Sequence, residues 1–215
     1  MRTTVLLGLR RALIFLFLPA IVASPPAHGA ADRANPDWPC IQPKVPVISA
    51  GMVWAGPEVE ENGKAWRKSA KIAALARAIS LRRLPIEEAK AEIDSFADTL
   101  GADNDARLTL LFTGVLQTVN AERSEIVAGI GRYARRQAAL ADKIKAATKE
   151  LNALRSKQDR SEAEQAKIDQ VEERLLWDTR VFDERQKSLT YVCESPVLLE
   201  RRLFALSRHI MSRLN

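Results

Sequence analysis

Residues 126–192 have the sequence "IVAGIGRYARRQAALADKIKAATKELNALRSKQDRSEAEQAKIDQVEERLLWDTRVFDERQKSLTYV". Two runs within it repeat at alternating steps of four and three residues, which is the spacing of a coiled-coil seam. The first run comprises Ile126, Ile130, Tyr133, Gln137, Leu140, Ile144, Ala147, Leu151 and Leu154. The second comprises Ile168, Val171, Leu175, Asp178, Phe182, Arg185, Leu189 and Val192. We therefore predict a coiled-coil hairpin over residues 126–194.

The segment between the two runs contains a signal for the start of a helix. Ser161 and Glu164 have the spacing of a capping box, in which each side chain binds the other residue's backbone N–H. The second helix should therefore return antiparallel to the first, with its tip near residues 158–160 and Leu151 facing Ile168. The two seams could equally pair between chains, in a swapped homodimer.

The residues before the hairpin are also predicted to be helical, so the fold class is all-α. Residues 64–125 form a helical body in this interpretation. A first helix covers residues 64–83, and a second covers 86–100 and stops at Gly101. A third begins near Asp105, after a turn with capping side chains, and continues to about Lys157.

Residues 195–215 are predicted to form a separate C-terminal helix that packs on the body. Ser195 followed by Pro196 is typical of a helix start. The apolar face carries Leu199, Leu203, Leu206, Ile210 and Leu214, and the other side carries Arg201, Arg202, Arg208 and Arg213. Contact of this basic face with an anionic membrane is an alternative, but we favour packing on the body.

Residues 31–63 are predicted to form an extended arm. Four prolines, Pro39, Pro43, Pro46 and Pro57, disfavour a helix there. The apolar residues that favour burial are Val45, Val47, Ile48, Met52, Val53 and Trp54. Trp38 and Trp54 are candidates for an arm surface that lines a ligand groove, although buried tryptophans more often serve packing.

Residues 1–30 have the composition of a secretory signal peptide. Arginines precede the apolar block "ALIFLFLPAIVA" at residues 12–23, and small residues follow it. A membrane anchor is the alternative, but a spanning helix needs about 20 apolar residues. We expect export, to the periplasm if the source is a Gram-negative bacterium.

The two cysteines, Cys40 and Cys193, are expected to form a disulfide. An oxidising compartment favours a single bridge between them. The hairpin pairing places Ile126 near Cys193, so the bridge should join the arm to the base of the hairpin. Two distant thiols are too few for a metal site, and His209 is the one histidine after residue 30.

Charge and composition argue against several function classes. Without the three arginines of the leader the formal net charge falls from +6 to +3, and aromatic residues are only 6% of the chain. We therefore expect no nucleic-acid binding. The chain lacks a Gly-rich phosphate loop, and Gly129 and Gly131 suggest close helix approach or a bend instead. We expect no catalytic residues, metal or cofactor, and thus no enzyme.

Basic side chains provide the candidate partner-binding residues. Arg155, Lys157, Gln158 and Arg160 lie at the hairpin tip, and Arg132, Arg135 and Arg136 lie near its base. Either group could contact an acidic partner, or could simply be solvated surface.

The hairpin resembles those of periplasmic adaptor proteins of efflux and secretion systems, whose β-rich flanking regions have no counterpart here. Residues 108–112, "LTLLF", resemble the LTxxQ motif of exported helical chaperones of the Spy type but differ at the last position. Our leading hypothesis is a non-enzymatic adaptor or scaffold that binds another envelope protein through its hairpin. The alternatives are a periplasmic holdase-type chaperone, and a small-ligand binder or enzyme that uses the Trp-bearing arm.

Overall fold

The computed structural model describes residues 37–215, and the predicted signal peptide lies outside them. The fold is all-α, as predicted. Helices α1 (Ala70–Ser80) and α2 (Ile86–Ala97) are short, and α3 (Asn104–Arg155) and α4 (Glu162–Met211) are very long. Three short 3₁₀ helices, Ala50–Met52, Ala65–Lys68 and Gly101–Asp103, lie in the connections. Among residues 37–215, no helix combines the length and apolarity needed to cross a membrane.

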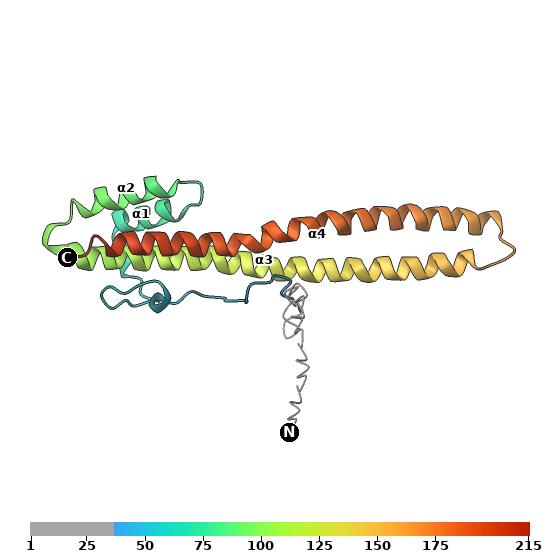
Figure 1. Ribbon diagram of the computed structural model, residues 1–215, viewed down its shortest axis with the longest axis horizontal. Coiled ribbons are helices and arrows are strands. Elements are labelled where there is room, and N and C mark those ends of the chain that lie inside the picture. The colour runs from blue at the N-terminus through green and yellow to red at the C-terminus, as the bar shows by residue number, and fades with distance from the viewer. Residues whose placement is uncertain (1–36) are drawn as a thin grey trace, which may run out of the picture.

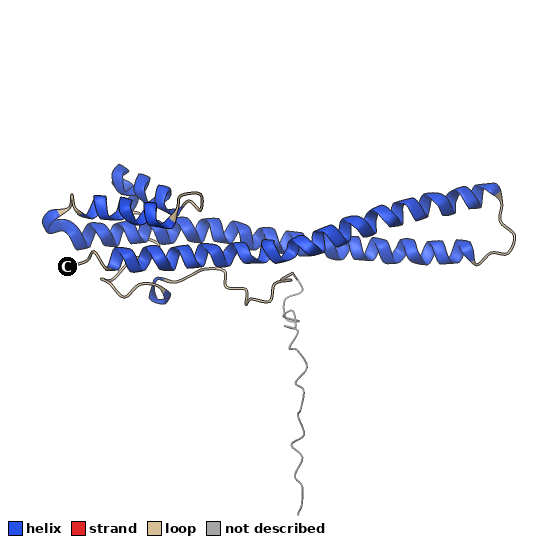
Figure 2. Cartoon of the chain, turned by 45° about the horizontal axis from the view of Figure 1, so that its top comes forward, coloured by secondary structure: helices blue, strands red, loops and turns tan. Residues whose placement is uncertain are grey.

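Helices α3 and α4 form an antiparallel hairpin along the whole length of the molecule (Figures 1 and 2). Leu151 and Ile168 belong to one buried cluster near the tip, as predicted. Farther from the tip, the Gln137 amide donates a hydrogen bond to the Phe182 carbonyl at 2.8 Å. The predicted antiparallel pairing of the two seams is confirmed.

The return helix starts where the sequence predicts, at the capping box of Ser161 and Glu164. The Glu164 carboxylate accepts from the Ser161 N–H at 3.0 Å and also pairs with Lys157. Lys157 and the Ser161 N–H together hold the pKa of Glu164 at about 2. This carboxylate therefore stays charged, and able to cap the helix, far into the acidic range.

The predicted helix start at Ser195 and Pro196 is wrong, because α4 runs through both residues without a break. Pro196 is buried, and the Ser195 hydroxyl donates to the Tyr191 carbonyl at 3.3 Å. An interior proline costs about 3 kcal/mol. Burial of Leu199, Leu203 and the apolar residues that follow on α4 offsets this cost. The predicted divisions at 125/126 and 194/195 thus coincide with no helix end.

Helices α1 and α2 pack on the hairpin at the end opposite the tip, while the arm follows its other side (Figure 1). The main core lies there, and its fully buried members include Ile72, Ile93, Leu111, Phe112, Leu203 and Leu206. The apolar face of residues 195–215, the last part of α4, belongs to the same core and includes Ile210. Packing of this segment on the body is therefore confirmed.

Two of the predicted helices are shorter than the sequence analysis suggested. Helix α1 begins at Ala70 rather than at residue 64, because the Ser69 hydroxyl caps it by accepting from the Ile72 N–H at 3.4 Å. Helix α2 ends at Ala97, and Gly101 adopts the left-handed conformation with a φ of 56° that glycine tolerates. The expected capping side chain before α3 is missing, since Asp103 makes no side-chain hydrogen bond to that helix.

The glycine that permits close helix approach is Gly114, which the sequence analysis missed. A Cβ atom at Gly114 would lie 2.9 Å from the Cβ of Ala76 and 2.9 Å from Cε3 of Trp66. At Gly129 the nearest neighbour is the Arg132 guanidinium, 3.7 Å away. At Gly131 the nearest atoms, Nη1 of Arg135 and the Asp37 carbonyl oxygen, are both 3.6 Å away. The expectation that Gly129 and Gly131 allow close helix approach is therefore wrong, and the alternative of a local bend stays a prediction.

We predict opposite effects for alanine at Gly114 and at Gly129. Alanine is favoured over glycine in a helix by about 1 kcal/mol, and overpacking of a core costs about 1–3 kcal/mol. Gly114→Ala should therefore lower the free energy of unfolding by about 1 kcal/mol, while Gly129→Ala should raise it by about 0.5–1 kcal/mol. Urea unfolding of both variants measures this, and equal shifts of the same sign would contradict the steric argument.

Candidate functional site

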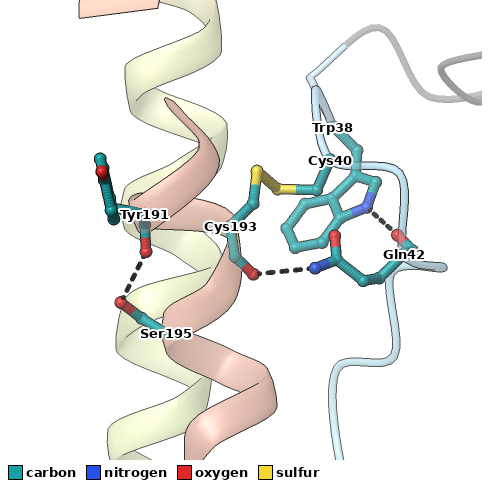
Figure 3. Close-up of a disulfide and its surroundings, with 6 residues drawn as sticks. All are labelled: Trp38, Cys40, Gln42, Tyr191, Cys193 and Ser195. Carbon is teal, nitrogen blue, oxygen red and sulfur yellow. Dashed lines mark hydrogen bonds between the residues drawn. A yellow bond between two sulfur atoms is a disulfide. The ribbon is translucent and has the colours of Figure 1, made fainter. Parts of the chain in front are cut away.

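The arm is joined to the hairpin by the predicted disulfide between Cys40 and Cys193, whose Cα atoms are 5.5 Å apart (Figure 3). Beside it, the buried Trp38 indole N–H donates to the Gln42 carbonyl at 2.6 Å. The Gln42 amide in turn donates to the Cys193 carbonyl at 3.3 Å. The start of the arm is thus held to α4 by one covalent bond and one hydrogen bond.

Farther along, α3 holds the arm through polar side chains. Asn120 accepts from the Ile48 N–H at 3.0 Å and donates to the Ile48 carbonyl at 2.8 Å, as a neighbouring β-strand would. Arg123 donates to the Val45 carbonyl. Sequence reasoning missed both residues, because a polar side chain on a long helix has the pattern of solvated surface.

The apolar residues of the arm divide between core and solvent. Ile48, Val53 and Trp54 are buried, and Trp54 stacks on Phe112 with ring centroids 4.0 Å apart. The expected burial of Val47 and Met52 is wrong, since each is 56% exposed. Val47 lies in the extended part of the arm, where side chains alternate, and it points away from the core because its neighbour Ile48 points inward. Met52 ends the 3₁₀ helix Ala50–Met52, in which Ala50 is the buried residue.

A groove of about 610 Å³ lies between the arm and α4. Its lining includes Trp38, Ile48, Met52, Arg123, Val197 and Phe204. Of the two predicted arm tryptophans, only Trp38 lies at the groove, because Trp54 is within the core. The two therefore do not line one common surface.

Arg123 is the unusual residue of this groove, because only 4% of it is exposed. The nearest carboxylate, that of Glu200, lies 3.9 Å from its Nη2 atom, which is an ion pair without a hydrogen bond. Its buried Nε–H has no acceptor. Burial lowers the pKa of Arg123 from its usual value, and Glu200 opposes that shift. The groove thus contains an incompletely paired buried cation.

The basic residues at the tip are largely occupied by contacts within the tip. Arg155 lies 2.6 Å from the Glu172 carboxylate, and Lys157 pairs with Glu164. Arg160 donates to the carbonyls of Arg155 and Lys157 at 3.0 and 3.1 Å. Gln158 is exposed beside them. The tip is therefore a compact turn whose positive charges are partly neutralised.

The basic cluster near the base of the hairpin is divided in the same way. Arg135 forms an ion pair of 2.5 Å with Asp37, at the start of the described arm. Arg132 and Arg136 are exposed on α3. One member of the cluster thus helps to hold the arm, and two face solvent.

The arginines of the last part of α4 are also partly used inside the molecule. Arg202 donates to the Ile79 carbonyl at 2.9 and 2.6 Å and to the Leu84 carbonyl at 2.9 Å, where α1 ends. Burial lowers its pKa from the usual value. Arg213 pairs with Asp94 and Asp98. These contacts bind α4 to the helical body. Arg202 and Arg213 are therefore engaged within the molecule, whereas the membrane alternative needed them on a free basic face.

The hairpin carries a second candidate surface that the sequence analysis did not identify. Leu176 and Trp177 on α4 are 75% and 65% exposed, and a shallow hollow beside them is lined by Gln170, Glu173, Arg174 and Arg180. The spacing of the sequence indicates that this pair is exposed, because Leu176 and Trp177 fall between the seam positions Leu175 and Asp178. Two large apolar residues outside a seam are expected to face solvent.

His209 is the one histidine in the described part of the chain. His209 makes its contact with Asp94 at 2.9 Å, half-buried between α4 and α2. Within residues 37–215, no three histidine, cysteine, aspartate or glutamate side chains lie together as a metal site requires. The groove and the Leu176–Trp177 surface are therefore the candidate sites of this structure.

Comparison with known proteins found no match: neither a protein-family model, nor a curated protein, nor a solved structure is significantly similar to this chain.

Proposed function

We propose that the chain is an exported, non-enzymatic interaction module that binds another envelope protein through its coiled-coil hairpin. The exposed Leu176–Trp177 pair carries the proposal. Large apolar side chains on a solvated helix favour association, and tryptophan is among the residues enriched at the energetic centres of protein interfaces. The leader-like residues 1–30 and the disulfide support export, to the periplasm in a Gram-negative source.

The surroundings of the pair suit a protein partner. Glu173, Arg174 and Arg180 border the hollow beside Trp177 and supply both signs of charge. An apolar centre with a polar rim is the usual organisation of a protein interface. The hairpin also extends well beyond the body at the tip end, so a partner could approach α4 there without contacting α1 or α2 (Figure 1).

Photo-crosslinking in living cells tests the proposal. A photoreactive residue at Glu173, one helical turn from Trp177, should capture one dominant envelope protein, identified by mass spectrometry. A second probe at Gln158 reports whether the tip takes part. Leu176→Ser combined with Trp177→Ser should abolish the capture, because these residues supply most of the apolar contact.

Tyr191→Ser provides the matched control, since Tyr191 is 76% exposed on the same helix but lies near the disulfide. It should leave the capture unchanged. Capture of many unrelated exported proteins would favour the holdase-type chaperone instead. If neither probe captures a protein although both are present in the folded chain, hairpin docking is wrong.

A further inference from the structure

The groove between the arm and α4 has the size and lining of a ligand site. Its volume of about 610 Å³ lies within the roughly 300–1,000 Å³ usual for small-molecule pockets. Ile48, Val53 and Val197 provide apolar walls. At its mouth, Met52 and Phe204 are 56% and 47% exposed, so apolar surface faces water there. A ligand that covers this apolar surface would be stabilised by its removal from water.

The charges of the groove favour an anionic group. Arg123 lies in its lining almost fully buried, and Arg201 adds a second cation. Glu200, the one carboxylate in the lining, is too far from Arg123 for a hydrogen bond and is itself half-exposed. A buried guanidinium is normally paired with an anion through hydrogen bonds, because desolvation of an unpaired charge is costly. A carboxylate at Nη2 of Arg123 would give the guanidinium the hydrogen-bonded anion that Glu200, 3.9 Å away, does not provide.

The backbone of the arm argues against an extended peptide as the occupant. A peptide binds beside an extended segment by pairing with its free N–H and carbonyl groups. Here the Val45 carbonyl already accepts from Arg123, and both backbone groups of Ile48 are bonded to Asn120. An apolar chain needs no such partners. Glu200 would also repel a doubly charged phosphate more strongly than a carboxylate with one charge.

We propose that this groove binds a free fatty acid, a single apolar chain with one carboxylate. The carboxylate pairs with Arg123 and Arg201, and the chain lies along Ile48, Val197 and Phe204 and covers Met52 at the mouth. This site is separate from the Leu176–Trp177 surface, so neither proposal depends on the other.

Calorimetric titration of the purified protein with sodium dodecanoate, below its micelle concentration, tests the inference. We expect one binding site. Dodecyltrimethylammonium, with the same chain and a positive head group, should bind at least about tenfold more weakly, because the arginines repel it. The absence of dodecanoate binding, or equal binding of the two amphiphiles, would overturn the proposal.

Variants then locate the site. Arg123→Met should weaken dodecanoate binding by at least about tenfold. Because Arg123 also holds Val45, two variants at exposed positions, Met52→Glu and Phe204→Glu, test the groove without removing a core contact. Each should weaken binding to a similar extent while the thermal unfolding curve stays unchanged.

Leu176→Glu is the matched control, since it places the same charge at an exposed apolar position of α4 outside the groove. It should leave dodecanoate binding unchanged. Equal losses in Leu176→Glu and Phe204→Glu would show binding to exposed apolar surface in general and would refute the groove. Partner capture from Glu173 should persist in Phe204→Glu, which separates this test from that of the proposed function.

Discussion

Replacing Cys40 and Cys193 with alanine should lower the free energy of unfolding by about 4 kcal/mol, one of the two largest effects we expect from this chain. The crosslink joins residues 153 positions apart, so it restricts nearly the whole described chain in the unfolded state. Chain-entropy arguments assign about 4–5 kcal/mol to a loop of this length. Guanidinium unfolding followed by far-UV circular dichroism measures the change.

The single variant Cys40→Ala provides a control, because it breaks the same bond and leaves Cys193 in place. It should lose a similar free energy. The loss should also weaken dodecanoate binding, since the arm forms one wall of the groove. A loss below about 1 kcal/mol would mean that the contacts of Trp38, Asn120 and Arg123 hold the arm without the crosslink and that the entropic argument fails.

Phe112→Ala should lower the free energy of unfolding by about 3–5 kcal/mol. Phe112 is fully buried on α3, and Trp54 of the arm stacks on it with an interplanar angle of 10°. The substitution removes the ring from the centre of the main core and also removes the stacking, which contributes about 0.5–1.5 kcal/mol of the total. Urea unfolding at neutral pH measures the loss.

Phe112→Leu separates the two contributions, because leucine refills much of the volume but cannot stack. We expect it to cost about 1–2 kcal/mol. Trp54 should then be more accessible to acrylamide quenching in Phe112→Ala than in Phe112→Leu. Equal costs for both variants would show that filling of the core has little effect at this position, contrary to the burial of Phe112.

The sequence predicted the hairpin well because its signals act over short distances. The seam around Leu151 and Ile168 and the capping box of Ser161 and Glu164 involve residues three or four positions apart, so they can be recognised without knowledge of the fold. The disulfide was predicted because the chain has only two cysteines, and the antiparallel pairing placed it at the base of the hairpin by bringing Ile126 near Cys193. The error at Pro196 has the opposite origin, because a local helix-start signal was outweighed by burial of the residues after it.

The candidate sites were less predictable. Arg123 has the spacing of a surface arginine on α3, and only the arm that passes over it buries it. Trp54 could not be separated from Trp38 by composition, although one lies in the core and the other beside a groove. The exposure of Trp177 could have been predicted, because this residue falls outside the seam. The seam pattern by itself predicts only which residues are buried.

The sequence by itself determined the all-α class and the hairpin with its tip, because helix periodicity and capping depend on neighbours along the chain. It also determined the pairing of the cysteines, because there are only two. Only the tertiary structure decided the path of the arm, the unbroken course of α4 through Pro196, and the groove beside Arg123. These depend on contacts between residues far apart in sequence, such as Arg123 with Val45 and Arg202 with Ile79. The free energy of such contacts comes from burial, which no local pattern records.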